Sequence, residues 1–156
     1  LYGAGDAKLG SIKGNTNMAK NGKELKAKFF KAIPAIEQLL EQVRVKADSG
    51  YIRGLTGRRL HIRSPHSALN TLLQSAGAYV MKYYTVALHK ALSKYGNKVL
   101  FVGNIHDEVQ LEVNEDIKEE VRVICEDIFK DITTLLSFKV PLEGEARIGG
   151  TWNDTH

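Results

Sequence analysis

The spacing of hydrophobic residues changes several times along the chain, and each change predicts a new element. Across residues 23–45 they recur at steps of three and four, the period of an amphipathic helix, which Pro34 should kink or divide. The same period runs over residues 64–94, where Pro65 suits the first helical position, and it returns after Asn114. The chain is therefore predicted to contain three main helical regions.

Segments rich in β-branched and aromatic residues lie between these helices. Residues 51–55 and 59–62 flank a Thr56-Gly57 turn and predict a hairpin, and a second hairpin is predicted within residues 99–113. A terminal strand is expected at about residues 138–148, and the polar stretch 15–22 is interpreted as an exposed loop. This order of helices and strands favours the α+β class, with helices layered on an antiparallel sheet.

Composition adds weak constraints on function. The 156 residues are 43% hydrophobic and 26% charged, which is ordinary for one globular domain, and no apolar run is long enough to span a membrane. A lone cysteine, Cys125, excludes an internal disulfide and suits a reducing cytoplasm, so we expect a cytoplasmic protein with no membrane partner. The net charge of +4 mildly favours an anionic partner. Basic residues gather in the first part of the chain and acidic residues in residues 108–131.

Two adjacent carboxylates, Asp107 and Glu108, follow His106 between the predicted strands of the second hairpin. Carboxylates held close together repel each other, so such a pair calls for a cation, a shared proton or full solvation. Mg²⁺ commonly takes one or two carboxylates together with substrate phosphates. The alternative for an isolated Asp-Glu pair is a solvated acidic turn.

The residues around this pair resemble a known family. Ile105-His106-Asp107-Glu108, continued by Val109-Gln110-Leu111-Glu112-Val113, is similar to the palm hairpin of family A DNA polymerases, the bacterial polymerase I superfamily. Four more stretches match in the family's order: Leu1-Tyr2-Gly3-Ala4-Gly5-Asp6-Ala7-Lys8, residues 50–59, residues 63–77, and residues 140–149 with Trp152. The similarity spans essentially the whole chain, and it is nearest to the phage replicases of the T-odd type.

This resemblance implies a fold and a catalytic site. It places residues 1–47 in the fingers and 48–156 in the palm of an incomplete polymerase right hand. It implies that Asp107 is a ligand of the catalytic metal ions, two Mg²⁺ in the complete enzyme. Glu108 would support the metal site, and His106 would lie near the primer terminus. The implied reaction joins deoxynucleoside triphosphates to a primer 3′-hydroxyl on a template.

A second group of polar residues, His66, Asn70 and Gln74, recurs at four-residue steps and so shares one helical face. Each side chain can donate a hydrogen bond, and the minor groove offers acceptors at nearly sequence-independent positions. The alternative is an exposed polar stripe on an amphipathic helix. The resemblance implies primer–template contact by this face and by Arg63. Bacterial members carry Arg where this chain has His66, whereas phage members also have His.

The first residues carry a further expectation. The resemblance places Tyr2 and Gly3 at the end of the fingers helix, where the family's tyrosine stacks at the templating position; a tyrosine in the core is the alternative. Arg58 and Arg59 could neutralise phosphates or be surface charges of a hairpin.

Parts that the family needs for catalysis have no counterpart here: a second metal-binding Asp, the cations of the fingers helix, the thumb and any exonuclease. We therefore expect a fragment, a processed chain or half of a split polymerase that is inactive without the missing N-terminal portion. A stand-alone DNA-binding or structural remnant is the competing hypothesis. A metal-dependent nuclease is disfavoured, since no further carboxylate cluster accompanies the Asp-Glu pair.

Overall fold

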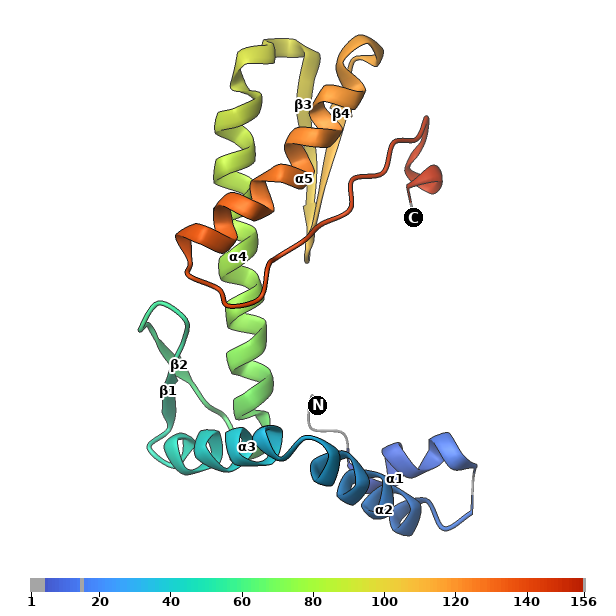
Figure 1. Ribbon diagram of the computed structural model, residues 1–156, viewed down its shortest axis with the longest axis vertical. Helices are drawn as coiled ribbons and strands as arrows, with labels where there is room; N and C mark the ends of the chain where they lie inside the picture. The colour runs from blue at the N-terminus through green and yellow to red at the C-terminus, as the bar shows by residue number, and fades with distance from the viewer. Residues whose placement is uncertain (1–4, 15, 156) are drawn as a thin grey trace. The chain divides into compact units, whose positions relative to one another are not determined.

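The computed structural model of the protein describes residues 5–14 and 16–155 (Figure 1). It consists of helices and two small antiparallel sheets, which confirms the predicted α+β class. By internal contacts the chain forms two compact units, residues 1–76 and residues 77–156. The fingers–palm boundary expected at residue 47 falls inside the first unit and stays a prediction.

The first unit begins with helices. They are α1 (Asp6–Gly10), a 3₁₀ turn η1 (Ser11–Lys13), α2 (Met18–Ala32) and α3 (Pro34–Ala47). Pro34 occupies the start of α3, where its missing N–H costs nothing, and Ile33 before it is non-helical. The division of this helical region at Pro34 is thus confirmed.

Two glycines allow α1 and α2 to cross closely. A Cβ at Gly22 would lie 1.8 Å from the carbonyl oxygen of Asp6, and one at Gly10 would lie 1.6 Å from that of Met18. Only glycine fits at either position. The interpretation of residues 15–22 as a loop was therefore wrong for its second half. Gly22 serves close helix packing there, although glycine lowers helix propensity.

The rest of the first unit is a hairpin against a small core. Strands β1 (Tyr51–Arg53) and β2 (Arg59–His61) pair antiparallel, and Gly57 in the connecting turn has a φ of +77°. Ile52 and Ile62 are buried beside Val43 and Ala47 of α3 and against the start of α4 (Ala68–Leu92). Both predicted strands and their turn are confirmed.

Helix α4 follows a 3₁₀ turn η2 (Pro65–Ser67). The Ser64 side chain makes no capping hydrogen bond to this turn. Instead the Ser64 carbonyl accepts bonds from the N–H and the hydroxyl of Ser67, at 3.0 and 2.8 Å. The backbone carbonyl, and not the hydroxyl, of Ser64 thus satisfies donors at the start of this turn.

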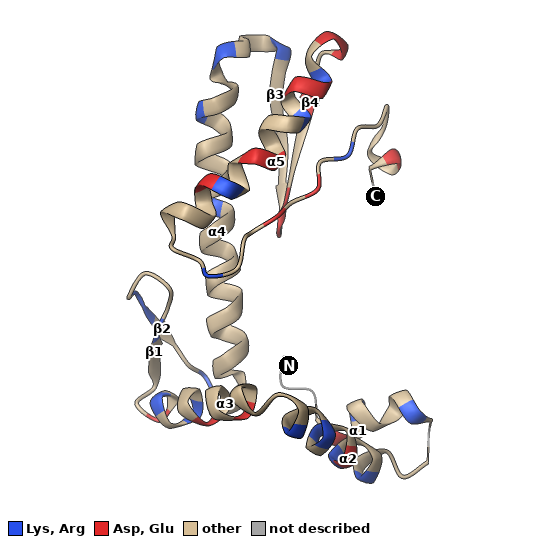
Figure 2. Cartoon of the chain, in the orientation of Figure 1, with Lys and Arg blue, Asp and Glu red and all other residues tan. Residues whose placement is uncertain are grey.

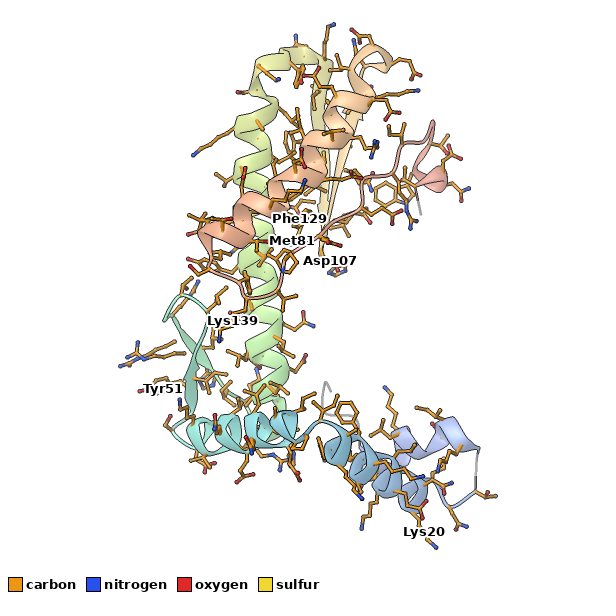
Figure 3. The ribbon with its side chains drawn as sticks, in the orientation of Figure 1. Lys20, Tyr51, Met81, Asp107, Phe129 and Lys139 are labelled. Atoms are coloured by element: carbon orange, nitrogen blue, oxygen red, sulfur yellow. The ribbon has the colours of Figure 1, made fainter. Side chains whose placement is uncertain are left out.

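The second unit packs α4 and α5 (Lys118–Leu135) with the hairpin of β3 (Val99–Ile105) and β4 (Glu108–Val113). Short 3₁₀ segments η3 (Ser93–Lys98) and η4 (Glu115–Ile117) join these elements. The buried core residues are Tyr84, Leu88, Leu92, Val99, Val121, Cys125, Ile128 and Ile132. Met81 and Phe129, labelled in Figure 3, pack against this core from α4 and α5. Cys125 is thus part of this apolar core.

The predicted terminal strand is wrong. Residues 138–149 form no strand and end in a short 3₁₀ turn η5 (Trp152–Asp154). Their backbone is bound by side chains of α5: Leu142 N–H donates to Thr133 Oγ1 at 2.8 Å, and Ala146 N–H donates to Glu126 Oε1 at 3.3 Å. The segment therefore runs alongside α5, and these N–H groups are hydrogen-bonded without a neighbouring strand.

Within the described residues, no helix is long and apolar enough to cross a membrane.

Candidate active site

The hairpin β3–β4 places the acidic pair. Ile105 pairs with Glu108, so His106 and Asp107 alone form a two-residue turn. This corrects the expectation that all three charged residues occupy the bend, because Glu108 is already the first residue of β4. A register shift between Phe101 and Gly103 adds a bulge to β3, a device that bends and twists a strand.

His106 has an unusual backbone conformation. Its φ is +54°, in the left-handed region that non-glycine residues rarely adopt. A positive φ at the first residue of a two-residue hairpin turn is the pattern of a type II′ turn, where glycine is the common choice. A histidine there costs about 1 kcal/mol or more. No local sequence pattern predicts this strain, because a His-Asp pair is not a typical hairpin turn.

The strand that leads into the turn is held by α4. Asn104 Nδ2 donates to Thr85 Oγ1 at 3.3 Å, and Thr85 Oγ1 in turn donates to the Met81 carbonyl at 2.8 Å. The rings of His89 and Phe101 lie 5.4 Å apart, centroid to centroid. The turn therefore projects from a strand braced on a long helix, which limits how far its side chains can move.

The two carboxylates have different surroundings. Asp107 is exposed at the tip of the hairpin (Figure 3). Glu108 is half-buried, and its Oε1 accepts a hydrogen bond from Gln110 Nε2. An exposed carboxylate beside a hydrogen-bonded one fits a partial set of oxygen ligands for Mg²⁺. Among the described residues no group of three or more potential metal ligands comes together.

The predicted primer–template residues belong to the first unit. His66 lies in the 3₁₀ turn η2, while Asn70 and Gln74 follow in α4. His66, Gln74 and Arg63 are exposed and Asn70 is half-buried. The buried Ala68 lies about 160° around the helix from Asn70, so the polar face points away from this unit's core. Tyr2 and Gly3 lie outside the described residues.

Comparison with known proteins identifies the family. The model of DNA polymerase family A matches residues 1–154. The chain belongs to DNA polymerase family A. The DNA-directed DNA polymerase of Enterobacteria phage T3 is 36% identical over the whole chain, and that of Escherichia phage Phieco32 is 38% identical over 99% of it. DNA polymerase I of Pseudomonas aeruginosa is 31% identical over 83% of the chain.

The family A chain covers only part of these relatives: 25% of the phage T3 polymerase, 26% of the Phieco32 polymerase and 15% of the P. aeruginosa enzyme. Among solved structures, the POL domain of Pol1 from M. smegmatis, in complex with DNA primer-template and dNTP, matches with a TM-score of 0.73. That match covers 84% of this chain and 25% of the other at 19% identity, so it supports the family A fold.

Proposed function

We propose that this chain supplies the catalytic hairpin and part of the DNA-binding surface of a template-directed DNA polymerase. One observation carries the proposal. In a chain that matches DNA polymerase family A over residues 1–154, Asp107 is exposed in a two-residue turn that is braced on α4. A rigid hairpin is a better support for a reacting centre than a loop, since catalysis needs fixed positions.

Within this proposal each residue of the turn has its own task. Asp107 offers its exposed carboxylate to divalent cations, and Glu108, oriented by Gln110, adds negative charge beside it. His106 is held next to Asp107 by the turn and lies near the primer terminus. Mg²⁺ bound here would supply activation of the 3′-hydroxyl and stabilisation of the phosphoryl oxygens. The chain's own contribution is the position and the charge of these groups.

Primer–template DNA is the proposed macromolecular ligand. His66, Asn70 and Gln74 would donate hydrogen bonds into the minor groove, and Arg63 would contact a phosphate. Such contacts sense the shape of a base pair and not its identity, which suits an enzyme that copies any sequence. Tyr2 and Gly3 are assigned to the templating position on sequence similarity alone.

Strand β3 supports the proposed need for further polypeptide. Its residues Leu100, Phe101, Val102 and Ile105 are 38–61% exposed, although a strand this apolar on both faces is typical of a sheet interior. Among the described residues β3 pairs with β4 alone. A segment that supplies more of the palm would cover this surface, and it would bring the second metal-binding carboxylate that we propose is needed.

Primer extension tests the proposal. The chain alone, with Mg²⁺, primer–template and the four deoxynucleotides, should not extend the primer. Addition of a polypeptide that contains the preceding three quarters of a phage relative should restore extension. Extension by the chain alone would show that it already contains all the required metal ligands. That result would contradict the proposal that the catalytic site needs residues from another polypeptide.

A non-enzymatic DNA-binding protein is the second candidate. It is favoured by the charge of the first unit, where residues 1–76 hold 13 Lys and Arg against 5 Asp and Glu. The two candidate functions predict different results when the upstream polypeptide is added to the primer-extension reaction. Tight DNA binding that never becomes extension with any upstream polypeptide would favour the binding protein.

A further inference from the structure

The hairpin β1–β2 holds two arginines directly opposite each other. Its register pairs Ile52 with Leu60 and Arg53 with Arg59. Ile52 is buried and Leu60 packs against the same core, so the alternation of side chains along a strand puts the two arginines on the opposite, outer face. Both arginines are exposed.

The hydrogen-bond pattern brings these two residues close. Gly54 N–H donates to the Arg58 carbonyl at 2.8 Å, so the neighbouring Arg53–Arg59 pair is a non-hydrogen-bonded pair of the ladder. Opposed side chains approach most closely in such pairs. Like charges placed there destabilise a hairpin. A bound anion would remove this repulsion.

Each guanidinium is also oriented by a neighbour. Arg53 Nη1 donates to the Gly57 carbonyl at 3.1 Å, and the guanidinium carbon of Arg59 lies 4.8 Å from the ring centroid of Tyr51. Tyr51 is labelled on β1 in Figure 3. Stacking on an aromatic ring fixes the plane of the fork and leaves its N–H donors free for a ligand. Within the described part of the chain, neither arginine forms an ion pair with a carboxylate.

We propose that the outer face of β1–β2, with Arg53 and Arg59 at its centre, binds a backbone phosphate of a DNA strand. The arginine fork matches the geometry of phosphate oxygens, and two of them can share one phosphate or hold two neighbours. The choice of DNA as the source of the phosphate rests on the proposed function. It is also supported by the net formal charge of +8 on residues 1–76, which suits an extended polyanion (Figure 2).

The experiment compares two adjacent arginines. Arg59→Gln removes a charge from the outer face, whereas Arg58→Gln removes the same charge from the face that Leu60 occupies, and Arg58 is also exposed. The affinity of the full chain for a fluorescent single-stranded oligonucleotide is measured by anisotropy at several salt concentrations without Mg²⁺. The slope of log affinity against log salt is negative, and Arg59→Gln should reduce its magnitude by about 0.7, the value for one lost phosphate contact with a single strand. Arg58→Gln should change the slope clearly less than Arg59→Gln does.

Competitors at matched ionic strength distinguish DNA from other anionic ligands of the hairpin. Poly-glutamate and free deoxynucleoside triphosphate are each added at equal charge concentration. If either displaces the oligonucleotide from the unaltered chain but not from the Arg59→Gln variant, the DNA assignment is overturned. Equal slopes for the two variants would overturn the hairpin site and leave the polymerase proposal standing. No DNA binding by the unaltered chain would overturn the site and the primer–template assignment together. If the slopes are as expected but the chain complemented with the upstream polypeptide still fails to extend a primer, that result would count against the polymerase proposal alone.

Discussion

The two compact units use their charges in opposite ways. The first, residues 1–76, has a net formal charge of +8, and the second, residues 77–156, has −4. In the described part of the first unit, only Lys13 and Lys26 form ion pairs among its 13 cations. In the second unit as far as residue 155, six of the nine Lys and Arg residues form ion pairs, and Arg122 bridges Glu119 and Glu126 on α5.

In the described residues, most cations of the second unit are paired with carboxylates of the same unit, whereas most cations of the first unit are not and could contact a ligand. The paired cations of α5 are neutralised locally, and exposed pairs of this kind contribute little stability. Ten of the 13 cations of the first unit lie on α2, α3 and the hairpin β1–β2 (Figure 2). Helix α2 carries one acidic residue and the hairpin carries none, whereas α3 carries two. A bound polyanion would neutralise these cations, whereas the exposed carboxylate of Asp107 in the second unit is suited to binding a cation. Under the proposed function, the first unit would bind DNA and the second would bind the metal ions.

The largest expected effect comes from the core of the second unit. Leu88 is fully buried, so Leu88→Ala should reduce the free energy of unfolding by about 2–5 kcal/mol through lost burial and a cavity. Val86→Ala, two residues away on the exposed side of α4, is the control and should cost little. If the units are separate, amide hydrogen exchange should accelerate in α5 and β3–β4 but not in β1–β2. Equal acceleration in both hairpins would show that the two units unfold together.

The first unit is sensitive at the α1–α2 crossing. Gly22→Ala places a Cβ against the backbone of Asp6, and overpacking of this kind costs about 1–3 kcal/mol. Gly5→Ala is the matched control, since a Cβ there meets nothing within 4 Å. Urea unfolding of both variants measures the difference. A Gly22→Ala protein as stable as Gly5→Ala would mean that the two helices do not pack at this distance.

DNA contacts on α4 should be smaller in effect and independent of sequence. Gln74→Ala should weaken binding of primer–template by about 1 kcal/mol, the size of one hydrogen bond, equally on several sequences. Gln38→Ala on α3 removes another exposed glutamine and serves as the control. Gel-shift titrations on duplexes of different composition compare the two. A loss confined to one base pair would indicate base-specific binding and contradict the minor-groove role.

Alkaline pH should destabilise the second unit. Burial raises the pKa of Tyr84, whose hydroxyl donates to the Cys125 carbonyl at 3.1 Å, and burial also raises the pKa of the Cys125 thiol. Both groups stay protonated in the folded chain while the unfolded chain loses these protons near their ordinary pKa values, so stability is full below about pH 8 and falls as pH rises. Tyr84→Phe should cost about 1 kcal/mol at neutral pH and make the fall above about pH 10 shallower. Urea unfolding at pH 7, 9 and 10.5 measures both effects, and an unchanged pH dependence would contradict ionisation of Tyr84 as a cause.

Local signals in the sequence predicted most of the elements. Pro34, the Thr56-Gly57 turn and the three- and four-residue periods act within a few residues, and each appeared where expected. Features that depend on distant partners were missed. Residues 138–149 contain β-forming residues, yet their N–H groups bond to α5 side chains, which no local pattern reveals.

The candidate site shows the same division. The sequence identified Asp107 as a turn residue, because charged residues between two apolar strands mark a bend. It did not predict that His106 would take a positive φ, because this follows from the register of β3 with β4. It also missed the hydrogen bond by which Gln110 orients Glu108. A Gln two residues after a Glu in a strand shares its face, and this spacing is the signal that could have found the contact.

The most direct test of the account is the rate of nucleotide incorporation by a complemented Asp107→Asn enzyme. The rate is measured in a single turnover with Mg²⁺ and saturating primer–template, alongside the dissociation constant for that DNA. We expect a rate about a thousandfold lower, comparable to the largest losses from removing one electrostatic stabiliser, with DNA affinity nearly unchanged. An unchanged rate, or a loss explained entirely by weaker DNA binding, would contradict the assignment of metal binding to the second unit.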